Sequence, residues 1–205
     1  MPIKKKEGLI ELFPEFQPMR VKYKDVLDFK AFYEALREWL LENDWKDSFG
    51  DLDHWETYYG ERIDRNGAKE IWIQWRPMKN AKDSKYLNYY LDFNFHCLGM
   101  TKVEVVKDGQ KVKVDKGEME LIIKAFIEKG YDKEFEKNAL LKPLLKIFQK
   151  RIYQQKFEER KKELHQETYA LQNFIKHWLK LKRYLPYEDT AMFFESKAWP
   201  SHLKE

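Results

Sequence analysis

Residues 86–99 read YLNYYLDFNFHCLG and alternate strictly between two kinds of position. The odd positions from Leu87 to Cys97 are apolar, whereas the even positions from Tyr86 to His96 are mostly polar. Successive side chains of an extended chain point to opposite sides, so this alternation predicts a β-strand with its odd face in the core. The role of the even face is the open question.

Other segments carry strand patterns of the same kind. Together they predict an antiparallel meander of five or six strands. A short edge strand is expected at 20–26, and further strands at 54–63, 69–77, 101–117 and 119–127.

A hairpin is predicted inside residues 101–117. Gly99 and Met100 are expected to turn the chain into it, and Asp108-Gly109 favours a type I′ turn because both central positions of that turn need positive φ. The pairing that follows sets Val105 against Val112, Val103 against Val114 and Glu104 against Lys113.

Two regions show helical periodicity. Apolar residues recur at intervals of three and four from Phe29 to Leu40, which predicts an amphipathic helix with Asp25 or Asp28 as its N-cap and its end near Asn43. In the last third of the chain an apolar stripe recurs every seven residues, at Phe157, Leu164, Leu171, Trp178 and Leu185.

The C-terminal helical region is long. No glycine interrupts residues 142–183, and a single helix over that span would measure about 60 Å. The polar centre at 154–167 indicates either a break into two antiparallel helices or an arm that projects from the body. We therefore expect an α+β protein with a sheet region at 1–140 and a helical region with an aromatic tail at 141–205.

Motifs for most kinds of catalysis are missing from the sequence. There is no glycine-rich phosphate loop, no G-x-S-x-G and no H-E-x-x-H, and the acidic loop at Asp51 and Asp53 fails the calcium-loop spacing. His96 and Cys97 are adjacent on a strand, so their side chains point apart and cannot form a catalytic pair. We expect no enzyme activity, no cofactor and no metal.

The location is expected to be cytoplasmic. Cys97 is the single cysteine, so no internal disulfide is possible. The N-terminus lacks the apolar core of a signal peptide, and no run of 18 apolar residues offers a membrane span.

Positive charge is concentrated in one segment. The whole chain has a net charge of +4, but residues 141–183 carry 12 basic and 4 acidic side chains. Such a field favours an acidic partner, RNA or a ribonucleoprotein, although a lysine-rich helix face is also typical of plain solvated surface. The candidate contacts are Lys146, Lys150, Arg151, Arg160, Lys161, Lys162, Lys176, Lys180 and Arg183.

The even face of the strand at 86–99 has three interpretations: solvated sheet, a base-stacking platform for RNA, or the lining of a pocket closed by the C-terminal helix. If Ile73 pairs with Leu91, then Trp72 lies opposite Asp92, and the next strand brings Glu104 near Asn94 and Lys102 near His96. The residues proposed for this face are Trp72, Arg76, Tyr90, Asp92, Asn94 and His96.

The order of elements, with a helix, an antiparallel meander and a long closing helix, resembles that of helix-grip proteins, and the resemblance implies a carrier of a small hydrophobic ligand. The stretches FKAFYEALREWL, VEVVKDGQKVKVDKGEMEL and LLKPLLKIFQKRI are similar to uncharacterised archaeal α+β proteins, which imply no activity. The aromatic tail AMFFESKAW at 191–199 either packs on the body or contacts another subunit, so self-assembly through the C-terminal helix and tail is a further alternative.

Overall fold

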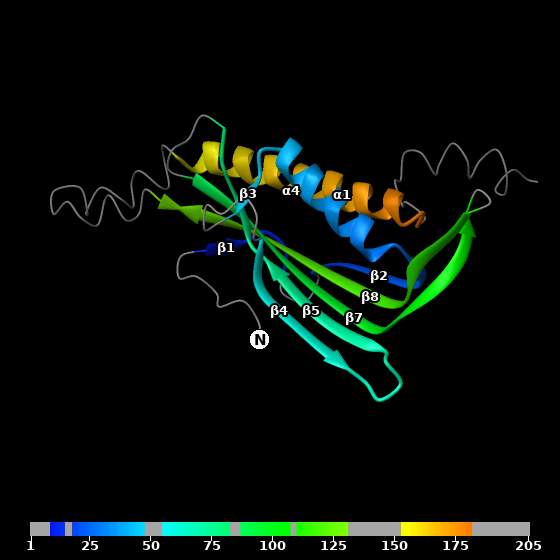
Figure 1. Cartoon of the computed structure of the whole chain (residues 1–205). Helices are drawn as coiled ribbons and strands as arrows, with labels where there is room; N and C mark the ends of the chain where they lie inside the picture. Colours follow the sequence, from blue (N-terminus) through cyan, green and yellow to red (C-terminus); the bar gives the residue numbers. More distant parts are fainter. Residues whose placement is uncertain are drawn as a thin grey trace, which may run out of the picture.

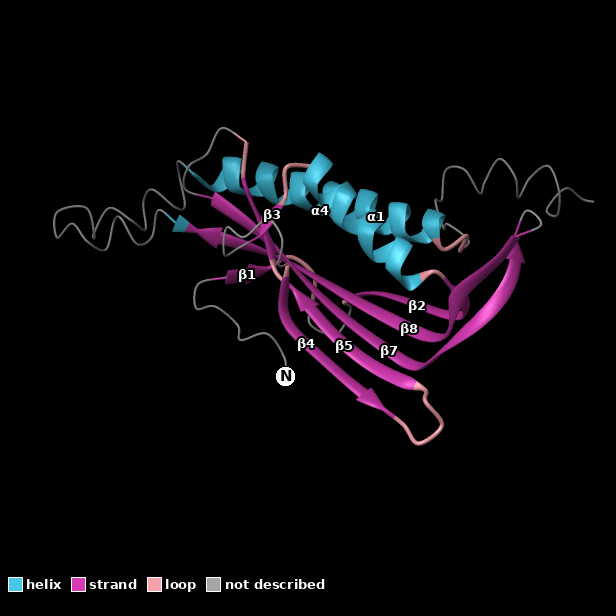
Figure 2. Ribbon diagram, viewed as in Figure 1, coloured by secondary structure: helices cyan, strands magenta, loops and turns pink. Residues whose placement is uncertain are grey.

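The computed structural model describes residues 9–14, 18–47, 55–82, 87–107, 110–130 and 153–181. In this part of the chain, an antiparallel sheet of eight strands carries two α-helices on one face (Figures 1 and 2). The predicted α+β class with a large antiparallel sheet is confirmed. The sheet has more strands than expected because three of them are two to four residues long, too short to produce an alternating pattern.

The elements follow one another in chain order. The strands are β1 (Leu9–Glu11), β2 (Met19–Leu27), β3 (Lys46–Asp47), β4 (Glu56–Ile63), β5 (Lys69–Trp75), β6 (Pro77–Asn80), β7 (Leu87–Lys107) and β8 (Gln110–Lys129), and the helices are α1 (Phe29–Glu42) and α4 (Gln154–Trp178). Within these residues, no helix is both long enough and apolar enough to cross a membrane.

Strands β7 and β8 form the centre of the sheet. On the outer side of β8, β2 pairs with residues 115–123 and β1 pairs with residues 126–128. On the outer side of β7, β5 pairs with residues 93–100 and β6 pairs with residues 88–90. The sheet is completed by β4 on β5 and by β3 on β6.

The expected turn at Gly99 and Met100 is wrong, because β7 runs through both residues as one strand. Its pairing with β8 shifts between Leu98 and Thr101, where two residues of β7 face only Gly117. Gly99 has φ 63°, the conformation of a β-bulge that absorbs one extra residue without reversing the chain. At Gly117 a Cβ atom would lie 2.9 Å from the Leu98 carbonyl oxygen, so glycine permits the close approach.

The hairpin beyond the bulge has the predicted register. Val103 pairs with Val114, Val105 with Val112, and Glu104 with Lys113. The Asp108-Gly109 turn lies outside the described residues. Figure 1 shows this end of the hairpin curving toward the side of the sheet that carries the helices.

Helix α1 begins and ends where its sequence predicts. The Asp28 carboxylate accepts a hydrogen bond from the Ala31 backbone N–H at 3.0 Å, which caps the first turn. Asn43 follows the last turn. The buried side chains Phe32, Leu36 and Leu40 form the stripe that packs on the sheet.

Helix α4 is continuous through the polar centre at 154–167, so the expected break is absent there. It does not project as an arm, because Leu164, Leu171 and Ile175 are fully buried in the same core as the strands. Its C-terminal part lies beside α1, where Trp178 contacts Phe32. Leu185, the last position of the predicted stripe, lies outside the described residues, as does the part of the helical region at 141–152.

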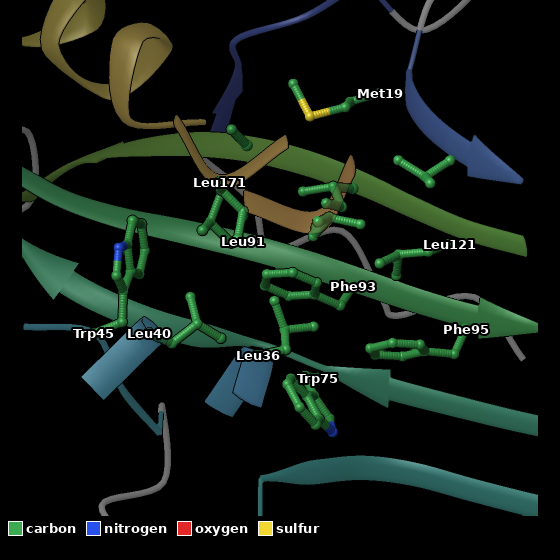
Figure 3. Close-up of a cluster of buried hydrophobic side chains, with 14 of the residues drawn as sticks. Met19, Leu36, Leu40, Trp45, Trp75, Leu91, Phe93, Phe95, Leu121 and Leu171 are labelled. Atoms are coloured by element: carbon green, nitrogen blue, oxygen red, sulfur yellow. The ribbon is translucent and has the colours of Figure 1, made fainter. Parts of the chain in front are cut away.

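The odd face of β7 is in the core, as predicted, and both helices cover this face rather than the even face. Figure 3 shows Leu91, Phe93 and Phe95 of β7 facing side chains from both helices and from β5. Cys97 is fully buried on this face, and burial raises the pKa of its thiol to about 12. The thiol is therefore protonated near neutral pH and is a poor nucleophile.

Candidate functional site

The sheet face opposite the helices contains the six residues proposed for it, but in a different register. Ile73 pairs with Phe95 instead of Leu91, so Trp72 lies opposite His96. A shift of four residues preserves the side to which each side chain points. Lys102 and Glu104 pair with β8 and not with β5 or the earlier part of β7, because β7 continues past Gly99.

One end of this face is a buried polar cluster. Arg76 donates from Nε to Asp92 Oδ1 and from Nη2 to Asp92 Oδ2, each at 2.6 Å. The two side chains are only 11% and 6% exposed. Two parallel charge-assisted hydrogen bonds with so little solvent form a rigid fork that fixes both groups in place.

Tyr90 and Glu128 extend the cluster. The Tyr90 hydroxyl donates to Glu128 Oε2 at 2.8 Å, and the Asn88 amide donates to the same oxygen at 3.2 Å. Burial and the bond to Glu128 raise the pKa of Tyr90 to about 12. This end of the face is thus not solvated sheet surface, because its groups are largely buried and engaged with one another.

The other end of the face is half-exposed. The rings of Trp72 and His96 stack with centroids 5.5 Å apart and planes inclined by 13°, and His96 Nε2 lies 3.0 Å from Glu70 Oε1. Asn94 lies between the two ends of the face and is half-buried. One face of the Trp72 ring is therefore already occupied, which weakens the interpretation of this strand pair as a base-stacking platform.

Cations that border the face are paired within the sheet. Arg20 of β2 lies 3.3 Å from Glu120, and Lys22 lies 2.5 Å from Glu118. Carboxylates at these positions repel phosphate, so the charges of the sheet do not favour a nucleic acid here.

Helix α4 separates its charges between two sides. On the inner side, Glu167 accepts hydrogen bonds from Trp45 Nε1 at 2.8 Å and from Lys79 Nζ at 2.7 Å. Glu163 accepts from Arg160 at 2.7 Å and from the Tyr89 hydroxyl at 3.3 Å. Two of the four carboxylates of the helix are thus drawn toward the sheet.

The outer side of α4 is rich in lysine. Of the predicted contacts, Lys162 and Lys180 are exposed, while Lys161 and Lys176 are half-exposed and Arg160 pairs with Glu163. Lys156 is also exposed on this helix, but it was not among the contacts predicted from the sequence, although Arg151 and Arg160 on either side of it were. Lys146, Lys150, Arg151 and Arg183 lie outside the described residues, as does the tail at 191–199.

A groove of about 400 Å³ opens between this lysine-rich side of α4 and Leu12, in the segment that follows β1. Its lining comprises Leu12, Glu158, Lys161, Lys162, His165 and Gln166.

Three rings meet beside the groove. The His165 ring lies 5.2 Å from Phe13 and 4.7 Å from Tyr169, and Tyr169 is 46% exposed. Sequence reasoning missed this cluster because Leu12 and Phe13 come from the opposite end of the chain. His165 and Tyr169 also have no periodic signal of their own.

A metal site and a carrier cavity are the alternatives to this groove. Among the described residues, no group of three or more His, Cys, Asp or Glu side chains is placed to hold a metal ion. The expected carrier cavity between the sheet and the C-terminal helix coincides with a contiguous core, in which Leu164, Leu171 and Ile175 pack against the strands. The groove on α4 is therefore the candidate site for an acidic partner, because it combines exposed lysines with a hollowed surface.

Comparison of the chain with protein-family models, with curated proteins and with solved structures found no match.

Proposed function

We propose that this protein is a non-enzymatic RNA-binding protein that holds a single strand along the outer side of α4. The groove lined by Lys161, Lys162 and His165 is the observation that supports this proposal. It offers two ammonium groups to phosphates at a place where the surface is hollowed.

The separation of charges on α4 strengthens the attraction between its outer lysines and phosphate groups. Because Glu163 and Glu167 are engaged on the inner side, Glu158 and Glu159 are the carboxylates of the helix that remain to oppose its outer lysines. Lys162 is exposed next to them, and a lysine that contacts a phosphate gains affinity by releasing condensed counterions.

Exposed rings beside the lysines fit a single strand better than a duplex. Tyr169 presents nearly half of its side chain to solvent and is held edge-on by His165. Stacking of one base on such a ring contributes about 1–3 kcal/mol and tolerates any base. The phosphates would then follow Lys161 and Lys162 while a base covers Tyr169.

The test is fluorescence anisotropy of a short labelled oligouridine over a series of salt concentrations. The double variant Lys161→Gln/Lys162→Gln should lower affinity, and the slope of log affinity against log salt should fall by about 0.7 for each lost contact. The matched control is Lys22→Gln/Lys24→Gln on β2, which removes the same charge from another surface and should leave binding nearly unchanged.

A second variant addresses stacking. Tyr169→Ala should weaken binding by about tenfold without changing the salt slope, since it removes a ring and no charge. No binding at low salt, or an equal loss in the β2 control, would contradict the proposal.

A further inference from the structure

A second pocket, of about 260 Å³, opens on the helix-bearing side of the sheet at the first turn of α1. Its apolar wall consists of Phe29 from α1, Ile71 and Ile73 from β5, and Met100 from β7. Ile73 and Met100 are buried, whereas Ile71 and Phe29 are only partly covered. The wall therefore offers accessible apolar surface continuous with the core.

Two ion pairs stand among the residues that line the pocket. Lys69 Nζ lies 2.8 Å from Glu61 Oε1, and the Tyr59 hydroxyl donates to Glu61 Oε2 at 2.6 Å. The Lys69 ammonium is the main reason that the pKa of Glu61 is lowered, with the Tyr59 hydroxyl second. Glu61 is thus an ionised carboxylate with a donor on each oxygen.

The second pair has the same polarity. Lys102 Nζ lies 2.8 Å from Asp115 Oδ1, and the Lys102 side chain is 68% exposed while that of Asp115 is 14% exposed. The carboxylate therefore lies deeper and the ammonium nearer to solvent. Lys30 also lines the pocket and is highly exposed, with its ammonium 3.7 Å from Glu34 Oε1.

The position of the ammonium groups favours an added acceptor at the mouth. The side chains of Lys69 and Lys102 are 47% and 68% exposed, against 25% and 14% for Glu61 and Asp115. An ammonium has three donors, so each lysine can bind a further acceptor from the solvent side. A negatively charged group at the mouth would find donors on Lys69 and Lys102, and an ammonium there would meet like charge.

We propose that this pocket binds a small amphipathic anion, a carboxylate with an aliphatic or aromatic body. The body lies on Ile71, Phe29 and Met100, and the carboxylate accepts from the lysines at the mouth. None of the lining residues belongs to α4, so this site is independent of the RNA groove, and either can fail without the other.

Three probes with one alkyl chain separate shape from charge: octanoate, octan-1-ol and octylamine, measured by isothermal titration calorimetry. Octanoate should bind about tenfold more tightly than octan-1-ol, which lacks the charge-assisted hydrogen bonds, and octylamine should bind most weakly. Equal affinities for octanoate and octan-1-ol would overturn the proposal.

Two variants locate the site. Ile71→Phe fills the pocket and should abolish binding of octanoate, whereas the matched Ile63→Phe, at an exposed position of β4 outside the lining, should not. Retained octanoate binding in a folded Ile71→Phe protein would refute the location.

The charge is tested at an exposed lysine, so folding is not at stake. Lys102→Gln should weaken octanoate binding by about five- to tenfold and leave octan-1-ol binding unchanged. Lys113→Gln, on the same hairpin and outside the lining, is the control. An equal effect of both variants on octanoate affinity would contradict the placement of the octanoate carboxylate beside Lys102.

Discussion

Replacement of Asp92 by asparagine should lower the free energy of unfolding by about 3 kcal/mol. The change removes the negative charge that faces Arg76 across two bonds of 2.6 Å and leaves the guanidinium at a position where its side chain is 11% exposed. An exposed ion pair contributes at most about 1 kcal/mol because water screens it. Loss of one partner of a buried pair costs about 3–5 kcal/mol because the remaining charge stays out of water.

Urea denaturation followed by tryptophan fluorescence measures this cost. The control is Glu34→Gln, which breaks the Lys30–Glu34 pair at 84% and 60% exposure and should change stability by less than about 0.5 kcal/mol. The double variant Arg76→Met/Asp92→Leu should be more stable than the sum of its single changes implies, because neither charge remains. A cost below about 1 kcal/mol for Asp92→Asn would refute the view that the Arg76–Asp92 end of this face excludes solvent.

Three further outcomes are expected. Leu171→Ala should destabilise the protein by about 3 kcal/mol in the same urea assay, because the side chain is fully buried between α4 and the sheet. Tyr169→Ala should cost only about 0.5–1.5 kcal/mol, because it removes a half-exposed ring and its contacts with Phe13 and His165, and similar costs for the two changes would contradict the packing of α4. Glu167→Gln should cost about 2 kcal/mol, since Lys79 loses its carboxylate at a largely buried site, and an unchanged urea midpoint would argue against that ion pair. Cys97 should resist a thiol-labelling disulfide reagent below pH 9.0 until urea is added, and rapid labelling of the native protein would contradict its burial. Because the pKa of the thiol is raised in the folded protein, the contribution of this group to stability is fully present below pH 9.0 and is lost as the pH rises toward 12.

The fold was predictable where a pattern repeats over several turns or rungs. The stripe of α1 and its Asp28 cap, the odd face of β7 and the valine register of the distal hairpin all depend on neighbours close in sequence. Gly99 misled the prediction because a glycine with positive φ serves a bulge as well as a turn, and the choice depends on whether β8 continues opposite it. The register of β5 was four residues off because alternation specifies the face of a strand and not its offset.

The candidate sites were less predictable because each is assembled from distant segments. Lysine composition indicated α4, but the groove needs Leu12 from the N-terminal end, and the inward pairing of Glu167 needs Trp45 and Lys79. The burial of Asp92 on the polar face has no local signal, since an alternating strand normally leaves such a residue in water.

The order in which short strands follow one another along β7 and β8 has a mechanical consequence. On one edge, β5 ends its pairing at Phe93 and β6 resumes at Tyr90; on the other, β2 ends at Ile123 and β1 resumes at Phe126. Since Phe93 pairs with Ile123 and Tyr90 with Phe126, both interruptions fall on the same two rungs of the central ladder.

At those rungs, within the described residues, β7 and β8 have no outer strand in register beside them, although the Leu12 N–H donates to the Ala125 carbonyl at 2.8 Å, and a two-stranded ribbon is marginal by itself. The outer strands therefore form two groups, one on each side of the interruption. Helix α4 spans both groups, with its Glu167 bonded to Lys79 of β6 in one group and with contacts to β2 in the other. The helix therefore contacts outer strands on both sides of the interruption and joins them.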